Sequence, residues 1–354
     1  MPGDAWTIDA VPVLGGARER WAIADGLLVR EPPPGAQPLP GGWVAPGLVD
    51  AHVHLTFETH ERLGLPRGSP ELIAAHLDLH RRAGVLAVRD AGALPGVALD
   101  PEPPGGGRVI SCGPFLVPPD SFLAHLVEPT PAEQAVARAR AMVRAGQPWV
   151  KLIADAPGPG HDPLAPVLGY PFALLAEISA AVHEEGGRLA AHVMGRTVAE
   201  VLAAGVDSIE HANWATREDV ETMAARGTAW TPTLTTVAHY LEPIADRVPP
   251  AAELLARQRE TLPYAVELGV PILAGTDEGA HGSVADEVAA LVRYGAPPAA
   301  AVAAASTAAR AFLGLPGLEE AAPADVVTFD ADPVADPRVL ARPAAVVCGG
   351  RRIV

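Results

Sequence analysis

Six side chains that can bind a metal or carry a proton lie within apolar runs of the sequence or at their ends. They are His52, His54, Lys151, His192, His211 and Asp277. His52 and His54 lie two positions apart in one run, so on a strand their side chains point to the same face. Taken singly, each of these histidines or carboxylates is typical of a packed or solvated residue. Together on one rim, imidazoles and a carboxylate suit a borderline-soft divalent metal such as zinc.

The elements that would position these residues are eight apolar runs of strand length, which alternate with helical patterns. The runs cover residues 47–55, 84–90, 108–113, 149–154, 188–193, 207–212, 229–234 and 270–277. Helical patterns lie at residues 131–146, 171–186, 216–227, 251–269 and, in an alanine-rich run, 301–314. Eight strands alternating with helices over about 230 residues predict an α/β fold of the (β/α)8 TIM barrel type. Such barrels place their active sites at the C-terminal ends of the strands, where the four histidines and Asp277 lie, and Lys151 belongs to the fourth strand.

The two ends of the chain read differently from its middle. Residues 1–46 and 324–354 contain short strand-like pieces. We predict that they pair into a small second domain, which leaves residues 47–323 for the barrel. The stretch 93–107 is too rich in proline and glycine for a full helix.

Composition and charge exclude several classes of function. The formal net charge of −16 argues against nucleic acid as a partner, since nucleic acid requires a basic face. No segment approaches the roughly 18–20 apolar residues of a membrane span, and the first residues lack the features of a secretory signal. Two cysteines, Cys112 and Cys348, suit a reducing compartment. We therefore expect a soluble, cytoplasmic protein that acts on a small molecule and has no membrane partner, with a homo-oligomer left open.

Several segments resemble the amidohydrolase superfamily over nearly the whole chain. They are PGLVDAHVHL (46–55), VKLIAD (150–155), AAHVMG (190–195), DSIEHA (207–212), AGTDEG (274–279) and ADVVTFDADPVAD (324–336). The sequence is most similar to the imidazolonepropionase-like and Xaa-Pro dipeptidase branch. This resemblance implies a TIM barrel with a small β-sandwich built from both termini. Two departures concern the substrate: residues 112–126 lack a glycine-histidine motif, and Ala212 follows His211 where glycine is common.

The resemblance also implies two divalent metal ions, which we take to be zinc. One ion would be bound by His52, His54 and Asp277, and the other by His192 and His211. In this branch the lysine of the fourth strand is carboxylated and bridges the two ions.

Lys151 suits that role, because it is the only lysine among 26 basic residues and lies inside an apolar run. A neutral amine can add CO2 to form a carbamate, which acts as a bridging carboxylate, whereas a guanidinium stays protonated. Burial near metals would lower the pKa of the lysine and supply the neutral amine. The alternative is compositional, since an arginine-biased chain could keep one lysine anywhere.

This constellation predicts a hydrolase that cleaves a C–N bond of an amide, peptide or cyclic amide with a metal-bridging hydroxide. Asp277 would act as the general base and then as the general acid. Loops after the strands would supply substrate contacts, for which the candidates are His125, Asn213, Trp214 and His281. Arg89 and Asp90 are expected to form an internal ion pair, and Cys112 to be a small buried apolar residue.

Three alternatives remain open. A lactonase or ester hydrolase would direct the same hydroxide at another carbonyl. A mononuclear deaminase would need a glutamate soon after His192, but the first acid is Glu200, and Lys151 would have no role. A binding protein on an inactive amidohydrolase fold should have lost metal ligands, whereas every expected one is present.

Overall fold

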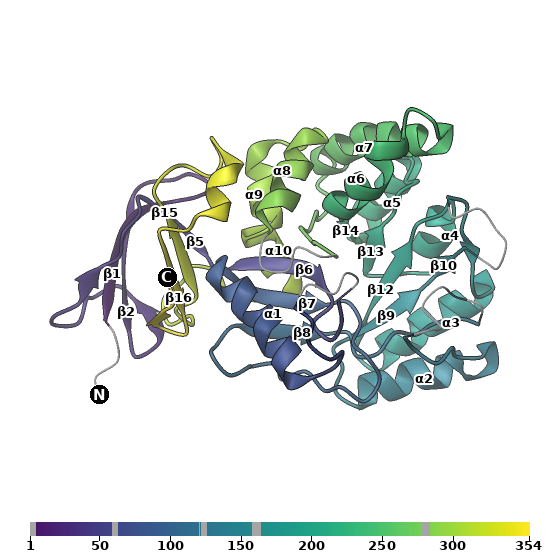
Figure 1. Ribbon diagram of the computed structural model, residues 1–354, viewed down its shortest axis with the longest axis horizontal. Coiled ribbons are helices and arrows are strands. Elements are labelled where there is room, and N and C mark those ends of the chain that lie inside the picture. Colours follow the sequence, from purple (N-terminus) through teal and green to yellow (C-terminus); the bar gives the residue numbers. More distant parts are fainter. Residues whose placement is uncertain (1–4, 59–62, 120, 122–125, 158–163, 278–283) are drawn as a thin grey trace.

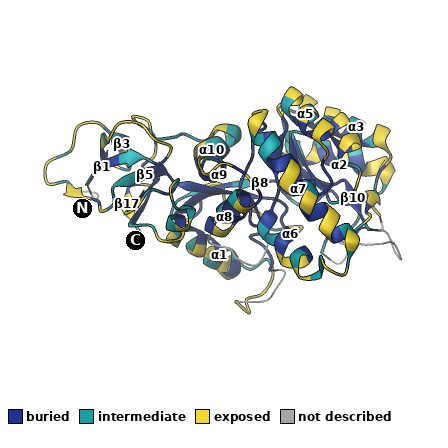
Figure 2. Ribbon diagram, turned by 90° about the horizontal axis from the view of Figure 1, so that it is seen from above, coloured by how far each residue is buried: buried dark blue, intermediate teal, exposed yellow. Residues whose placement is uncertain are grey.

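The computed structural model describes residues 5–58, 63–119, 121, 126–157, 164–277 and 284–354. Two regions are visible in Figure 1: a β-sheet that contains both ends of the described chain, and a larger α/β region beside it. Figure 2 shows that the strands of the α/β region are buried while its helices turn exposed faces outward. Within the described ranges, no helix combines the length and the apolarity that a membrane span needs.

The α/β region is a ring of parallel strands, which are buried along almost their whole length except for the third, which is only partly buried. In order they are β6 (Leu48–Val53), β7 (Val85–Asp90), β8 (Arg108–Ser111), β9 (Trp149–Ile153), β12 (Arg188–Val193), β13 (Ser208–His211) and β14 (Ala229–Thr231). A bridge between Leu116 and Leu152 joins the β8 side to β9. Strands covered on both faces need apolar residues at every position, which explains why the sequence shows continuous runs here.

The eighth predicted strand, residues 270–277, runs in the expected place but forms only an isolated bridge, between Trp230 and Ile272. Its backbone N–H groups bind three different segments: Leu273 donates to Trp230, Ala274 to Ala304 and Asp277 to His52. Ala51 of β6 donates in turn to Ala274, so the segment still connects β14 to β6. A regular ladder is absent because the segment is shared among these neighbours.

Helices surround the ring (Figure 1). They are α1 (Pro70–Arg82), α2 (Ala132–Arg144), α3 (Phe172–Glu184), α4 (Val198–Ala203), α5 (Arg217–Arg226), α6 (Leu234–Leu241), α7 (Pro249–Glu267), α8 (Ala285–Arg293), α9 (Pro298–Ala304) and α10 (Thr307–Leu313), with short 3-10 turns η2 (Glu242–Ile244) and η3 (Pro337–Ala341). The predicted helix at 216–227 is confirmed: Thr216 and Asp219 form a capping box, and Gly227 ends α5 in the left-handed conformation. As expected, the described chain forms no helix at 93–107.

Two sequence predictions need correction. The run 301–314 is not one helix: α9 and α10 are separated at Ala305, whose carbonyl oxygen turns away to accept the N–H of Val49 in β6. The run 229–234 is strand only as far as Thr231. Thr233 then adopts a left-handed conformation and α6 begins at Leu234.

The second region is a sheet to which both ends of the chain contribute. Its strands are β1 (Trp6–Pro12), β2 (Glu19–Ala24), β3 (Leu27–Val29), β4 (Gln37–Pro38), β5 (Trp43–Pro46), β15 (Val326–Phe329), β16 (Ala345–Cys348) and β17 (Arg351–Arg352). The hydrogen-bonded order is β17-β16-β15-β5-β1-β2-β3, with β4 beside β1. Ile23, Val44 and Val347 share one apolar cluster although they lie in different halves of this path. The predicted sandwich and the domain limits stay predictions.

The sheet and the ring meet at Gly84, in the turn before β7. Its φ of +80° is in the left-handed region, and a Cβ atom there would lie 3.0 Å from both γ-methyl carbons of Val327 in β15. Gly186, after α3, has nearly the same φ of +79°, but a Cβ atom there would meet nothing within 4 Å. The two glycines therefore share a conformational constraint and differ in packing.

We predict that Gly84→Ala destabilises the protein by about 1–2 kcal/mol more than Gly186→Ala does. Both changes incur the cost of a left-handed alanine, and only the first also forces Val327 to move. Urea unfolding of the two variants and the wild type measures the difference. Equal losses of stability would show that the sheet does not pack tightly on the ring.

Candidate metal centre and active site

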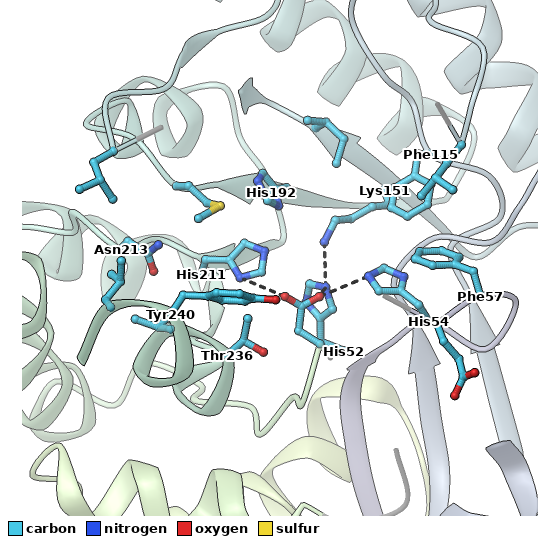
Figure 3. Close-up of a pocket in the computed structure, with 18 of the residues that line it drawn as sticks. His52, His54, Phe57, Phe115, Lys151, His192, His211, Asn213, Thr236 and Tyr240 are labelled. Carbon is cyan, nitrogen blue, oxygen red and sulfur yellow. Dashed lines mark hydrogen bonds and ion pairs between the residues drawn. The ribbon is translucent and has the colours of Figure 1, made fainter. Parts of the chain in front are cut away.

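The six side chains singled out in the sequence meet at the C-terminal ends of the strands. Figure 3 shows five of them pointing toward one another: His52, His54, Lys151, His192 and His211. The sixth, Asp277, lies among them. Its Oδ1 is 3.1 Å from Nε2 of His52 and 3.3 Å from Nε2 of His54, and its Oδ2 is 3.9 Å from Nδ1 of His211.

The possible metal ligands form two neighbouring groups. One ligand atom each from His52, His54 and Asp277 lies within 4.8 Å of the others, a spacing that a single ion can span. The rings of His192 and His211 meet edge to face at 4.5 Å between centroids, and the ring of His211 lies 5.2 Å from that of His52. Nζ of Lys151 is 3.4 Å from Nε2 of His52. Imidazoles with one carboxylate fit zinc, and metal binding itself stays a prediction.

Left-handed backbone at three successive strand ends helps to aim this group. His211, Thr233 and Asp277 have φ values of 66°, 48° and 58°, which non-glycine residues rarely adopt. Regular alternation along β13 would send Glu210 and His211 to opposite sides. The turn at His211 instead brings its ring to Asp277, while Glu210 faces the barrel interior. Nδ1 of His211 is 2.7 Å from Oγ1 of Thr233, so a hydrogen bond also connects the end of β13 to the segment that follows β14.

Beneath the cluster, the buried carboxylate of Glu210 contacts three side chains. Its Oε2 is 2.7 Å from Nδ1 of His52, and its Oε1 accepts from Nη2 of Arg89 at 2.7 Å and from Oγ of Ser208 at 2.6 Å. With Nδ1 of His52 on Glu210, its Nε2 faces Asp277 and Lys151. Burial and Lys151 lower the pKa of His52, but Asp277 and Glu210 raise it overall. The sequence had suggested an ion pair between Arg89 and Asp90, but Arg89 pairs with Glu210 instead. Asp90 accepts from the backbone N–H groups of Leu55 and Gly92.

A second buried carboxylate, Asp50, ties the two segments that carry His52 and Asp277. Asp50 accepts from the N–H of His52 at 3.2 Å, and from the N–H and hydroxyl of Thr276 at 3.0 and 2.7 Å. The segments approach so closely that a Cβ atom on Gly275 would lie 2.6 Å from Cβ of His52. Glycine is thus required beside the first pair of histidines.

The electrostatics of the cluster favour an ionised Asp277 and lower the pKa of Lys151. Burial would raise the pKa of Asp277, but the nearby imidazoles of His52, His54 and His211 hold it well below its usual value. Burial lowers the pKa of Lys151, although Glu210 and Asp277 oppose that shift. Burial also lowers the pKa of His211 to about 3. Cys112 is fully buried and its pKa is raised to about 12, so it is the inert apolar residue that the sequence predicted.

The cluster lies at one side of a cavity of about 490 Å³. Asn213 lines it, whereas Trp214 faces elsewhere, with the guanidinium of Arg196 3.7 Å from its ring centroid. His125 and His281 lie outside the described residues.

Sequence reasoning missed several residues of this cavity. Thr236, Tyr240 and Leu241 line it from α6, and Figure 3 shows the hydroxyl of Tyr240 directed toward His211 and His52. Nothing in the pattern marked α6, because residues 229–234 read as one strand. For Glu210 and Asp50 a signal existed: both are acids inside otherwise apolar strands, one and two positions before a candidate ligand.

The position of α6 depends on a buried carboxylate of α8. Glu287 accepts from the N–H groups of Leu234 and Thr235 at 2.9 and 2.8 Å and from the hydroxyl of Thr235 at 2.8 Å. These N–H groups begin the helix and have no partner within it. Burial nevertheless raises the pKa of Glu287 to about 7.

Comparison with known proteins agrees with this architecture. The Amidohydrolase family pattern matches residues 43–353. An uncharacterised protein of Mycobacterium tuberculosis is 36% identical over 341 residues, which are 93% of this chain and 90% of that protein. The structure is similar to a Xaa-Pro dipeptidase with bound methionine (TM-score 0.79, 21% identity, 98% and 99% of the two chains). It is also similar to A. niger ochratoxinase (TM-score 0.78, 20% identity, 99% and 96%). These likenesses confirm a TIM-barrel-like α/β fold.

We predict that Glu210→Gln destabilises the protein by about 3 kcal/mol, because it leaves the guanidinium of Arg89 buried without an anion. Glu253→Gln is the matched control. It removes a carboxylate that pairs with Arg196 and Arg257 at the surface and should cost less than about 1 kcal/mol. Chemical denaturation measures both. Similar losses would contradict the role given to Glu210 in balancing buried charge.

We predict that Glu287 makes stability fall as pH rises from its ordinary pKa of 4.5 to about 7. In that window the folded protein binds a proton that the unfolded chain has released, so raising the pH favours unfolding. Glu287→Gln removes this contribution, which is on the order of 3 kcal/mol. The unfolding free energy of the variant should therefore increase relative to that of the wild type as the pH rises from 4.5 to 8. A constant difference between the two proteins over this range would contradict the prediction.

Proposed function

Because the chain belongs to the amidohydrolase family, we propose that it is a metal-dependent hydrolase that cleaves a C–N bond of a small molecule. The observation that carries the proposal is the convergence of four imidazoles, one ionised carboxylate and one buried amine beside a cavity. The likeness to a dipeptidase supports an amide or peptide bond over an ester.

We assign one divalent ion to His52, His54 and Asp277, and a second to His192 and His211. Lys151 would bridge them as a carbamate formed with CO2. Its buried position, its lowered pKa and the 3.4 Å separation from His52 support this assignment. The donor set favours zinc. When bound, the ions would supply a nucleophilic hydroxide at neutral pH and polarise the scissile carbonyl.

The residues of the chain would then orient the substrate and move one proton. Asp277, held ionised by its imidazole neighbours, would accept the proton of the attacking water and deliver it to the leaving nitrogen. The hydroxyl of Tyr240 points toward the cluster and could donate to the carbonyl oxygen of the substrate (Figure 3). Asn213 lines the same cavity, and its Oδ1 accepts from Nε2 of Gln258. This hydrogen bond would orient its amide toward a substrate.

A hydrolysis screen with and without metal tests the proposal. Metal-loaded protein should act on at least one of four classes: dipeptides, N-acyl amino acids, cyclic amides or lactones. Chelation should abolish that turnover, and zinc should restore it. Turnover that chelation leaves unchanged would rule out the metal mechanism, and hydrolysis restricted to lactones would replace the C–N bond by an ester.

We predict that Lys151→Arg loses the second metal although it conserves charge, because a guanidinium cannot add CO2. Lys151→Glu, which places a carboxylate on a shorter stem, should keep some metal and a trace of activity. Metal per chain is measured by elemental analysis, and reconstitution of the stripped wild type should be faster with added bicarbonate. An active Lys151→Arg protein with two metals per chain would refute the carbamate.

A further inference from the structure

The wall of the cavity next to the cluster is apolar. Phe57, Phe115 and Ile153, which share one apolar cluster, form it, and Val237, Leu241 and Leu254 line other parts of the cavity. The ring of Phe57 stacks on that of His54 at 4.8 Å between centroids, and the rings of Phe57 and Phe115 are 6.3 Å apart. The apolar wall therefore begins at a candidate metal ligand. A group seated on it would be bonded almost directly to the reacting carbonyl.

Among the described residues that line the same cavity, one cationic side chain lies outside the cluster. Arg67 lies in the segment before α1, and the structure shows no ion pair or hydrogen bond between its guanidinium and any described residue. Its backbone is fixed close to the apolar wall, since the N–H of Gly68 donates to the carbonyl of Thr56 at 2.7 Å. A guanidinium in this setting suits a carboxylate, which it can bind with two parallel hydrogen bonds.

We propose, on the basis of the hydrolase function above, that the substrate is an N-acyl amino acid. Its apolar acyl or aryl group would lie on the wall formed by Phe57, Phe115 and Ile153, and its free carboxylate would pair with Arg67. A cavity of about 490 Å³ is in the size range that encloses such a molecule. Hydrolysis breaks the C–N bond, forms a C–O bond to the oxygen of water, and yields a carboxylic acid and an amino acid. No further reactant is needed.

The acyl part is tested with a graded series on the metal-loaded protein: N-acetyl-, N-butyryl-, N-hexanoyl- and N-benzoylglycine. Because each buried methylene strengthens binding, kcat/KM should rise roughly threefold to fourfold per methylene up to the capacity of the cavity. A flat or falling series, or a preference for unacylated dipeptides, would overturn the inference and leave the hydrolase function intact.

The carboxylate part is tested with a pair of substrates that differ only in that group, N-hexanoylglycine and N-hexanoylmethylamine. Arg67→Gln should raise KM for the first about tenfold and for the second less than about twofold. Arg20→Gln, which changes a surface arginine of β2 with an 86% exposed side chain, is the matched control and should change neither. An equal effect of Arg67→Gln on both substrates would refute the carboxylate site.

Binding separates this inference from the proposed function. Metal-free protein should bind N-benzoylglycine in calorimetry, and Arg67→Gln should weaken that binding about tenfold. If no amide is turned over with any metal but this binding pattern holds, the hydrolase function fails and the ligand class stands. If the metal-free protein shows no binding that depends on Arg67, the ligand class fails whatever the activity.

Discussion

The rest of the site depends on the contacts that the buried carboxylate of Glu210 makes. Inside the ring one anion must compensate the guanidinium of Arg89, which cannot lose its proton, and it lies close enough to Lys151 to affect that amine as well. Burying a charge without a partner is costly, so burial lowers the pKa of Lys151, and the anion of Glu210 opposes part of that shift. The same carboxylate fixes the ring of His52. One side chain thus sets the orientation of an imidazole and acts on the pKa of the only amine side chain in the sequence.

Much of the ring was predictable because its strands are short and buried on both faces, which produces continuous apolar runs and clear punctuation. The predictions of secondary structure failed where tertiary contacts, and not the local sequence pattern, determine the backbone conformation. Val49 takes the carbonyl of Ala305, and an otherwise uniform alanine-rich run therefore breaks into two helices. The segment 270–277 shares its hydrogen bonds among several neighbours and so escapes the strand definition. Neither event leaves a mark in the composition of the segment concerned.

For the site, residue type and place in the pattern located six converging side chains, because the C-terminal ends of parallel strands meet on one rim. The partner of Arg89 could not be read in the same way. The acid that follows it in sequence is occupied by backbone N–H groups, and the acid that pairs with it lies 121 residues later. The position of Tyr240 could not be predicted from the sequence either. It depends on the direction in which α6 leaves β14, and this direction is set by the left-handed conformation of Thr233, which is unusual for a threonine.

The pairing of β5 with β15 has a consequence for how this protein folds during its synthesis. Val326 pairs with Pro46, 280 residues earlier, and Val44 shares an apolar cluster with Val326 and Val347. When the first strands leave the ribosome, β1 and β2 can pair at once, but one edge of β5 has no partner until almost the whole ring has been made. Long-range pairing of this kind slows folding and leaves a strand edge open to other chains. Residues 326–354 can therefore complete this sheet only after most of the ring has been synthesised.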